Sequence, residues 1–507
     1  MGTETELKLE LTTEGLRKLR ASRVLPRNTR TEEQLTSSYF DTPKHKLAKN
    51  GLTLRVRRNG NKRLQTIKSG QFEGSFRRGE WEREIKGDLP DLHIIQGTAL
   101  APVATRKLKH KLRPVFETRV HRTTVPIREN ESLIEVALDE GRVRAGLKFA
   151  PIGEVELELK RGKASDVFKL ARKIGQLVPA TLALTSKAER GYELIEERPD
   201  QAVRAEKINL RRGMSTADAL RVVGRSVLRQ IIANQTAVER ADPEGVHQMR
   251  VGLRRLRAAI SLFSKLLGDK QTQRITAELK WLLGELGPAR DLDVYETGTI
   301  EPVRRAVLPK FGMKELESSL VSLRESAFAR AKVAVDSPRY RTLLLNTLQW
   351  LEIGEWTKRS RHHGARPIER FAICILARRT QKAKKKARKL RELNSRERHK
   401  LRIAIKKLRY AIDFFEHLFE GHKAKKNLSC FKACLGHLQD RLGALNDISV
   451  HQSLAPRLVQ GKTHTKVRAR AFAAGIVSRR EQSKIEPLLN AANKDAKKLS
   501  HLNAFWT

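Results

Sequence analysis

The segment at residues 4–10 places charges of both signs at alternate positions. Glu4, Glu6 and Lys8 alternate with Thr or Leu, which is the two-residue period of a β-strand. The same alternation recurs at 51–58, 132–140 and 153–160. One such strand is usually a solvated sheet face, but converging faces would form a polar interior that needs a charged occupant. Besides residues 4–8, the charged positions are Arg55, Arg57, Glu135, Asp139, Glu154, Glu156 and Glu158.

These residue types together suggest phosphate chemistry. Arg and Lys on several strands can surround phosphates, and carboxylates on opposing strands can hold Mg²⁺ or Mn²⁺. Such ions bridge phosphate oxygens and can activate a water molecule for in-line attack. A substrate with three phosphates and two cations would account for the mixed charge, and a closed barrel could enclose it.

The positioning elements change in type near residue 200. Short alternating segments with turn residues between them fill residues 1 to about 195, with helical stretches near 12–21 and 164–178, which predicts an antiparallel β domain. Beyond a charged linker the pattern becomes helical, which predicts an all-α bundle. We therefore expect an α+β multidomain chain with domains at 1–197 and 207–504 and a linker at 198–206.

The composition indicates a polyanionic partner. The 507 residues carry 103 Lys and Arg against 57 Asp and Glu, a formal net charge of +46, which favours nucleic acid, an anionic membrane surface or a phosphate polymer. Aromatic residues make up only 5%, which counts against binding of single strands by stacking. The three cysteines form no metal-type pair, which fits a reducing cytoplasm, and we find no signal peptide or membrane-spanning run.

The helical half contains an internal repeat. Residues 246–263 align with 398–415, and 286–294 align with 442–450, which predicts a duplicated unit with repeats at about 207–335 and 336–504. Each copy has an apolar stripe and a separate basic stripe at helical spacing. Four cations in a row destabilise an isolated helix, so their repetition indicates a track for a polyanion. The basic stripes are His247, Arg250, Arg254 and Arg257, and His399, Arg402, Lys406 and Arg409.

The first 195 residues resemble the CYTH domains, also called triphosphate tunnel metalloenzymes. The resemblance rests on Glu-x-Glu-x-Lys at 4–8, YFDTP at 39–43, GLTLRVRR at 51–58, IEVALDEG at 134–141, GEVELEL at 153–159 and SKAERGY at 186–192. It implies an eight-stranded antiparallel barrel that forms a tunnel, and a cofactor of Mg²⁺ or Mn²⁺. The subgroup that the chain looks most like is the bacterial CYTH–CHAD inorganic triphosphatases.

The resemblance also implies roles for single residues. As metal ligands it implies Glu4, Glu6, Glu135, Asp139, Glu154 and Glu156, with Glu158 as a weaker candidate. As catalytic and phosphate-binding residues it implies Lys8, Arg55, Arg57, Lys68 and Arg122. Arg78 and Glu80 stand at matching places, and we count Arg78 among the substrate-binding residues with Lys187 and Arg190 of the closing helix.

The second half resembles the CHAD domain, a helical module associated with binding inorganic polyphosphate on a basic surface. The resemblance rests on the two aligned helices and on the LGxxxD turns with Asp291 and Asp447. We therefore expect hydrolysis of inorganic triphosphate to pyrophosphate and phosphate, with polyphosphate as a partner and a cytoplasmic location that includes polyphosphate granules. Two alternatives stay open: a non-catalytic scaffold that binds polyphosphate or nucleic acid, and a CYTH enzyme for an organic triphosphate, either an adenylyl cyclase or a thiamine-triphosphatase.

Overall fold

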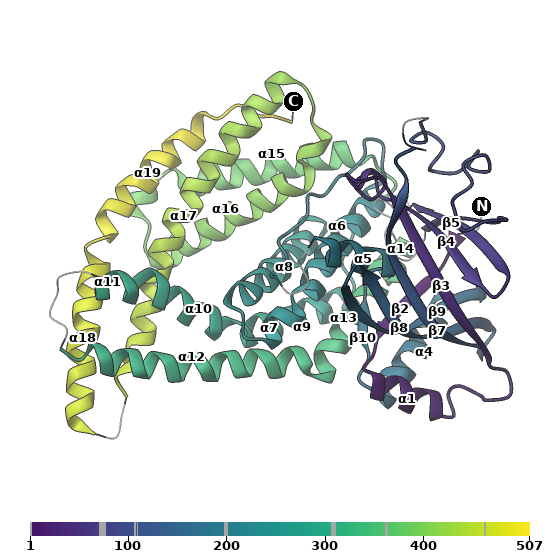
Figure 1. The fold of residues 1–507 in the computed structure, drawn as a ribbon. Helices are drawn as coiled ribbons and strands as arrows, with labels where there is room; N and C mark the ends of the chain where they lie inside the picture. Colours follow the sequence, from purple (N-terminus) through teal and green to yellow (C-terminus); the bar gives the residue numbers. More distant parts are fainter. Residues whose placement is uncertain are drawn as a thin grey trace. The chain divides into compact units, whose positions relative to one another are not determined.

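The computed structural model describes residues 3–69, 78–105, 108, 110–196, 201–305, 311–359, 364–460 and 463–506 (Figure 1). Contacts divide the chain into two compact units. Unit 1 consists of Met1–Gln201 and Pro338–Glu355, and unit 2 consists of Ala202–Ser337 and Trp356–Thr507. Residues 198–200 of the predicted linker lie outside the described residues.

Unit 1 is built on one antiparallel sheet. Its order is β1-β6-β5-β4-β3-β7-β8-β9-β2-β10, which gives ten strands where eight were expected. Among the described residues no ladder joins the outermost strands, β1 and β10, so the expected closed barrel is not seen in the hydrogen bonding. The strands are β1 (Thr3–Glu4), β2 (Glu6–Glu10), β3 (Thr31–Asp41), β4 (Leu52–Asn59), β5 (Lys62–Ser69), β6 (Arg78–Glu84), β7 (Arg113–Glu129), β8 (Ser132–Ala145), β9 (Lys148–Arg161) and β10 (Thr181–Ala183).

One face of this sheet is apolar because the strands alternate. Leu7 of β2, Val136 of β8 and Leu157 of β9 are almost fully buried on this face. Helix α1 (Thr13–Ala21) packs against β8 and β9, and helix α4 (Ala164–Leu177) packs against β7 and β9; both helices were expected from the sequence. Two further helices, α2 (Lys46–Lys49) and α5 (Lys187–Ile195), follow β3 and β10 in the chain. The core therefore holds the strands in a register that leaves the charged positions on the opposite face.

One helix of unit 1 comes from the second half of the chain. Helix α13 (Pro338–Ile353) lies at the start of the second predicted repeat in sequence, but it packs on α4 and β10 of unit 1. The guanidinium of Arg172 in α4 donates a hydrogen bond of 3.0 Å to Asn346 Oδ1, and it also donates to Gln349. Because β10 pairs with β2, α13 supports the edge of the sheet that carries Lys8.

Unit 2 contains helices and, among its described residues, no strand. The aligned segments 246–263 and 398–415 fall on α8 and α16, whose apolar stripes are buried as expected. The segment 286–294 forms the short helix α10, whereas its counterpart 442–450 lies inside a helix of 38 residues. The helices are α6 (Thr216–Ala233), α7 (Gln235–Glu239), α8 (Pro243–Leu262), α9 (Lys270–Glu285), α10 (Gly287–Tyr295), α11 (Glu301–Arg305), α12 (Met313–Asp336), α14 (Glu355–Arg359), α15 (Ile368–Ala387), α16 (Ser395–Phe415), α17 (His422–Val459), α18 (His464–Gln482) and α19 (Ile485–His501), with the π-helix η1 (Glu296–Ile300) after α10.

A glycine in β8 tests the packing of the sheet. A Cβ atom at Gly141 would lie 2.1 Å from the carbonyl oxygen of Arg119 in β7, so the backbone of one strand would have to shift. We expect Gly141→Ala to lower the free energy of unfolding by about 1–3 kcal/mol, as overpacking does. The control is Gly175→Ala in α4, where a Cβ atom meets nothing within 4 Å and helix propensity should stabilise the chain by about 1 kcal/mol. Equal melting temperatures for the two variants would contradict this packing.

Candidate functional site

The charged positions of the first strand face those of β9 and β8 directly. In the β2–β9 ladder Glu6 pairs with Glu158, Lys8 with Glu156 and Glu10 with Glu154. In the β8–β9 ladder Glu135 pairs with Glu158 and Asp139 with Glu154, and in the β7–β8 ladder Arg122 pairs with Asp139. Directly paired residues point to the same side of a sheet, so these residues share one face.

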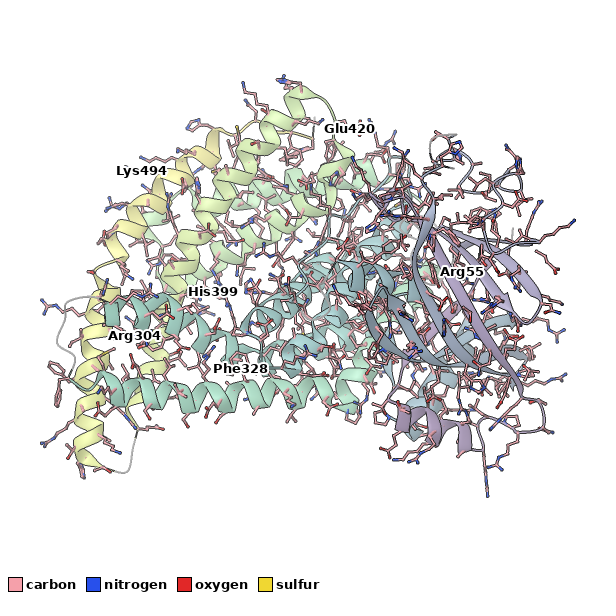
Figure 2. The ribbon with its side chains drawn as sticks, viewed as in Figure 1. Arg55, Arg304, Phe328, His399, Glu420 and Lys494 are labelled. Carbon is pink, nitrogen blue, oxygen red and sulfur yellow. The ribbon has the colours of Figure 1, made fainter. Side chains whose placement is uncertain are left out.

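The same face continues through the other strands. Tyr39 of β3 pairs with Arg55 of β4, and Thr53 of β4 pairs with Lys68 of β5. Lys68 in turn pairs with Glu80 of β6. Figure 2 labels Arg55 on the sheet of unit 1. We call this side of the sheet, from Lys8 on β2 to Glu80 on β6, the charged face.

Three carboxylates on the charged face form a compact acidic cluster. Oxygen atoms of Asp139, Glu154 and Glu156 all lie within 4.8 Å of one another. Lys187, the first residue of α5, reaches into this cluster: its Nζ atom lies 2.6 Å from Asp139 Oδ2 and 2.9 Å from Glu156 Oε1, and it also contacts Glu154. Asp139 and Glu154 are fully buried, and no described group donates a hydrogen bond to Glu154 Oε2.

Two further cations touch the acidic cluster from neighbouring strands. Arg122 donates to Asp139 Oδ1 at 2.7 Å and to Glu156 Oε2 at 2.5 Å. Lys8 Nζ lies 2.5 Å from Glu156 Oε1 and 3.3 Å from Glu6 Oε1. Glu156 is therefore shared by three cations, Lys8, Arg122 and Lys187.

These contacts favour the ionised form of two carboxylates of the acidic cluster, Glu156 and Asp139. Burial alone would raise the pKa of Glu156, but Lys187, Lys8 and Arg122 hold that pKa well below its usual value. The pKa of Asp139 is lowered in the same way by Lys187 and Arg122, against burial and the charge of Glu156. Burial would lower the pKa of Lys187, yet Glu154 and Glu156 raise it above the usual value. Carboxylate oxygens are the hard donors that Mg²⁺ and Mn²⁺ prefer, so the three carboxylates of the cluster are a donor set that fits such an ion.

Other predicted metal ligands lie apart from this cluster. Glu135 is 39% exposed, and its partner is Lys160, whose Nζ lies 3.1 Å from Glu135 and 2.7 Å from Glu158. Glu6 is buried and faces Glu158 across the β2–β9 ladder. The structure thus places Glu135 and Glu158 around Lys160, apart from the acidic cluster, whereas Glu6 is linked to the cluster through Lys8.

The predicted phosphate-binding cations on β4 and β5 differ in whether a carboxylate lies close enough to balance their charge. Glu80 Oε2 lies 2.9 Å from Lys68 Nζ, and Glu80 Oε1 lies 3.8 Å from Arg55 Nη2. Arg57 forms no ion pair with a described carboxylate, and its Nε atom is buried without a hydrogen-bond partner. The charge of Arg55, then burial, then the charge of Arg122 lower the pKa of Arg57 to about 10. Of the three described cations on β4 and β5, Arg57 is therefore the one that would gain most from an anion.

Two predicted residues are placed only by their backbone. Glu4 of β1 pairs with Arg78 of β6, but the side chains of both lie outside the described part of the structure. Arg190 of α5 is described, and its Nη2 lies 3.4 Å from Glu10 Oε1 and 3.7 Å from Glu154 Oε2.

The charged face also contains a residue that the sequence reasoning missed. Tyr39 is 3% exposed, faces Arg55 and stacks on Phe116 with ring centroids 4.6 Å apart. Burial raises its pKa, but the charge of Arg55 and a hydrogen bond with Arg55 outweigh this and lower the pKa overall. Tyr39 lies two residues after Ser37 on the same strand, so the two side chains point to the same side. Because Ser37 pairs with Arg57 in the same ladder, strand alternation could have assigned Tyr39 to the charged face.

In unit 2 some residues of the two basic stripes come close to each other and the others do not. Four of their cations, Arg250 and Arg254 of α8 and Arg402 and Lys406 of α16, interact electrostatically with one another, and we call them the central cations. Arg250 Nη2 lies 3.8 Å from Asp291 Oδ1, and Asp447 affects the pKa of both Arg402 and Lys406. The other stripe residues lie around this group: His247 is near Arg290, His399 Nδ1 lies 3.1 Å from Asn446 Oδ1, and Arg409 is near Asp413 (Figure 2 labels His399).

Comparisons with known proteins find one domain in each half of the chain, and the second match includes the segment Pro338–Glu355 that packs in unit 1. Residues 2–192 match the CYTH domain and residues 223–456 match the CHAD domain. An inorganic triphosphatase of Haemophilus influenzae is 32% identical over 163 residues, which cover 32% of this chain and 46% of that protein, about half of its length. The crystal structure of the CHAD domain from the plant Ricinus communis matches with a TM-score of 0.52 and 28% identity over 60% of this chain and 98% of that one.

A weaker likeness is found to a putative adenylyl cyclase from Hippeastrum, whose structure is described as revealing a dominant triphosphatase activity. Its TM-score is 0.29 at 16% identity, over 38% of this chain and 96% of that one. Among the described residues, no helix combines the length and the apolar character needed to cross a bilayer.

Proposed function

Because the chain carries a CYTH domain followed by a CHAD domain, we propose that unit 1 hydrolyses inorganic triphosphate to pyrophosphate and phosphate with Mg²⁺ or Mn²⁺, and that unit 2 binds polyphosphate. The observation that carries the first part is the charged face. It combines a buried acidic cluster with Arg55, Arg57, Lys68 and Arg122 on neighbouring strands. A pure anion binder gains nothing from carboxylates beside its ligand, whereas a metal-dependent phosphatase needs both.

The strand order supports a tunnel around this face. β1 is the outermost strand on one side of the order, and β2 is second from the other side, yet only Thr5 separates them in the chain. The sheet must therefore curl until its two sides nearly meet. A curled sheet with its apolar face packed outward against α1 and α4 encloses the charged face, as barrels that hold ligands do.

Different residues of the charged face would then bind the phosphates and the divalent ion. Arg55, Arg57 and Lys68 would hold the outer phosphates, with Arg57 as the least compensated of the three. Asp139, Glu154 and Glu156 would hold the divalent ion, with Glu4, Glu6 and Glu135 as further candidates. When bound, such an ion neutralises phosphate charge and lowers the pKa of a coordinated water. Lys187 would have to withdraw from the carboxylates and would then be free to pair with a phosphate.

The substrate is tested by comparing phosphate release from tripolyphosphate, ATP and thiamine triphosphate by the full chain. The described charged face consists mainly of cations and carboxylates, which suits a substrate made only of phosphates. We therefore expect tripolyphosphate to have the highest kcat/KM. A preference for ATP or thiamine triphosphate would instead favour the organic-triphosphate alternative, and no release from any of them would favour a scaffold.

Polyphosphate binding by unit 2 is carried by the central cations. Burial and then the charges of Arg402 and Arg254 lower the pKa of Lys406 to about 7. Four cations brought together on two helices store repulsion that a polyanion would relieve. The same surface could contact nucleic acid, so titrations with polyphosphate and with duplex and single-stranded DNA separate the two ligands.

The lowered pKa of Lys406 predicts pH-dependent binding. Only the ammonium form attracts a polyanion, so affinity for polyphosphate should fall as the pH rises from about 6 to about 8, and Lys406→Met should flatten this slope. Because the pKa in the folded chain is below the unfolded value of 10.5, this group destabilises the folded chain fully below pH 7. The penalty disappears as the pH rises towards 10.5. A slope that Lys406→Met leaves unchanged would contradict this assignment.

A further inference from the structure

A second group of cations in unit 2 gathers around Ser261 at the end of α8. Lys407 of α16 donates to Ser261 Oγ at 3.1 Å, and Arg379 of α15 donates to Ser261 O at 3.0 Å. Lys382 of α15 and Arg257 of α8 lie within electrostatic reach of Lys407. We call these four, Arg257, Arg379, Lys382 and Lys407, the Ser261 cations.

The Ser261 cations have no acidic partner among the described residues. Within the part of the chain that the structure describes, none of them forms an ion pair, and Arg379 Nε is buried without a hydrogen-bond partner. Burial, followed by the charges of Arg379, Lys382 and Arg257, lowers the pKa of Lys407. Such an arrangement opposes folding unless an anion occupies it.

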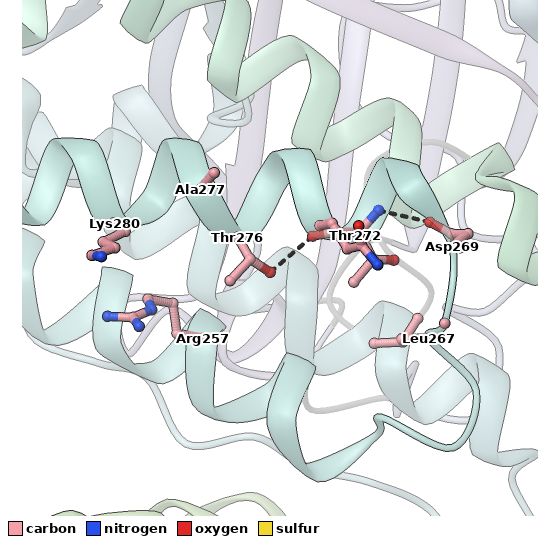
Figure 3. Close-up of a pocket in the computed structure, with 9 residues that line it drawn as sticks. Arg257, Leu267, Asp269, Thr272, Thr276, Ala277 and Lys280 are labelled. Carbon is pink, nitrogen blue, oxygen red and sulfur yellow. Dashed lines mark hydrogen bonds between the residues drawn. The ribbon is translucent and has the colours of Figure 1, made fainter.

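A cavity lies beside this group and shares Arg257 with it. The cavity has a volume of about 340 Å³ and is lined by α8, α9 and the loop between them. Figure 3 shows Arg257 and Lys280 at one end, and Asp269 at the other end. Asp269 is 4% exposed, and its Oδ1 accepts a hydrogen bond of 2.6 Å from the backbone N–H of Thr272. The basic end can therefore hold an anion away from the only acid that lines the described cavity.

We propose that Lys280 and the Ser261 cations form a second phosphate-binding site in unit 2, which holds one part of a phosphate polymer while the central cations hold another. This rests on the proposed binding of polyphosphate by unit 2. None of the described residues that line the cavity is aromatic, so bases would find no stacking surface among them and a phosphate polymer is favoured over single-stranded nucleic acid. Two sites that hold the same polyphosphate molecule bind it more tightly than either site alone, because once the first site is occupied the second contact is intramolecular.

The test is a titration of the full chain with long-chain polyphosphate and with tripolyphosphate, in a chelator that prevents hydrolysis. The double variant Arg379→Gln with Lys407→Gln should weaken long-chain binding about tenfold or more, since the tethered contact is lost. Its effect on tripolyphosphate, which is too short to bridge two sites, should be much smaller. The matched control is Lys385→Gln, an exposed lysine on the same helix α15, which should change neither affinity.

Thermal melting separates a lost site from a damaged fold. Removing uncompensated charges should leave the melting temperature of the ligand-free double variant unchanged or raise it. Long-chain affinity equal to that of the parent chain would overturn the second site, as would a loss of affinity that only accompanies a lower melting temperature. If the parent chain binds no polyphosphate at all, the proposed function of unit 2 fails as well. If the double variant Arg254→Gln with Arg402→Gln weakens binding of long-chain polyphosphate and the double variant Arg379→Gln with Lys407→Gln does not, only the second site is overturned.

Discussion

Replacing Glu156 with glutamine is expected to reduce metal-dependent phosphate release by about 10³-fold or more, because one neutral side chain removes a predicted metal ligand and the shared partner of three cations. Glu156 contacts Lys8 Nζ at 2.5 Å, Arg122 Nη2 at 2.5 Å and Lys187 Nζ at 2.9 Å. Its folded-state pKa is far below the usual value, so the carboxylate is charged at any pH at which the enzyme would be assayed. The measurement is kcat/KM for tripolyphosphate at saturating Mg²⁺ and Mn²⁺.

The control for Glu156→Gln is Glu135→Gln, a predicted metal ligand that lies outside the acidic cluster and is 39% exposed. If the cluster alone holds the essential ion, Glu135→Gln should keep most of the activity. Equal losses in the two variants would mean that the essential ion also uses the group around Lys160. Activity of Glu156→Gln close to that of the parent chain would contradict the assignment of the cluster.

Replacing Lys187 with methionine is expected to be strongly destabilising in a chelator and to be rescued by divalent ions. The buried ammonium contacts all three carboxylates of the acidic cluster. Breaking a buried ion pair by removing one partner typically costs about 3–5 kcal/mol. Since Mg²⁺ or Mn²⁺ would supply the missing charge, we expect the ion to raise the melting temperature more in the variant than in the parent chain.

The measurement for Lys187→Met is calorimetric melting with and without Mn²⁺, which reports on the ion independently of activity. The matched control is Lys160→Met, since Lys160 also bridges two carboxylates but is 39% exposed. Exposed pairs contribute little, so its loss should cost less than about 1 kcal/mol. A Lys187→Met chain that melts equally with and without Mn²⁺ would indicate that the cluster is a structural ion-pair network and holds no metal.

The charged face could be predicted from the sequence because alternation assigns residues to the two sides of a strand. Lys8, Arg55 and Glu156 all lie on the side that this rule predicts. Alternation does not give the strand order, so it could not reveal that Asp139 joins Glu154 and Glu156 while Glu135 lies apart. The resemblance to CYTH domains supplied the candidates, and the register of β8 against β9 separated them.

Helical positions were harder to predict than strand positions. The resemblance to CYTH domains implies substrate binding for Lys187, and nothing in SKAERGY shows that α5 points its first residue into an acidic cluster. The basic stripe of α8 follows helical spacing, yet Arg257 lines a cavity and interacts electrostatically with Lys407, whereas Arg250 and Arg254 belong to the central cations. Helix α13 has the same 3.6-residue pattern as its neighbours in the chain. Its own sequence therefore gives no indication that it packs on α4 in unit 1.

The central claim is that the acidic cluster holds the divalent ion that hydrolysis of triphosphate requires. The most direct measurement follows Mn²⁺ binding by calorimetry and phosphate release from tripolyphosphate in the same preparations of the parent chain and of Glu154→Gln with Glu156→Gln. We predict that the parent chain binds Mn²⁺ and releases phosphate only when Mn²⁺ or Mg²⁺ is present, and that the double variant loses both properties while it stays folded. A folded double variant that still binds Mn²⁺ and hydrolyses tripolyphosphate would contradict the account.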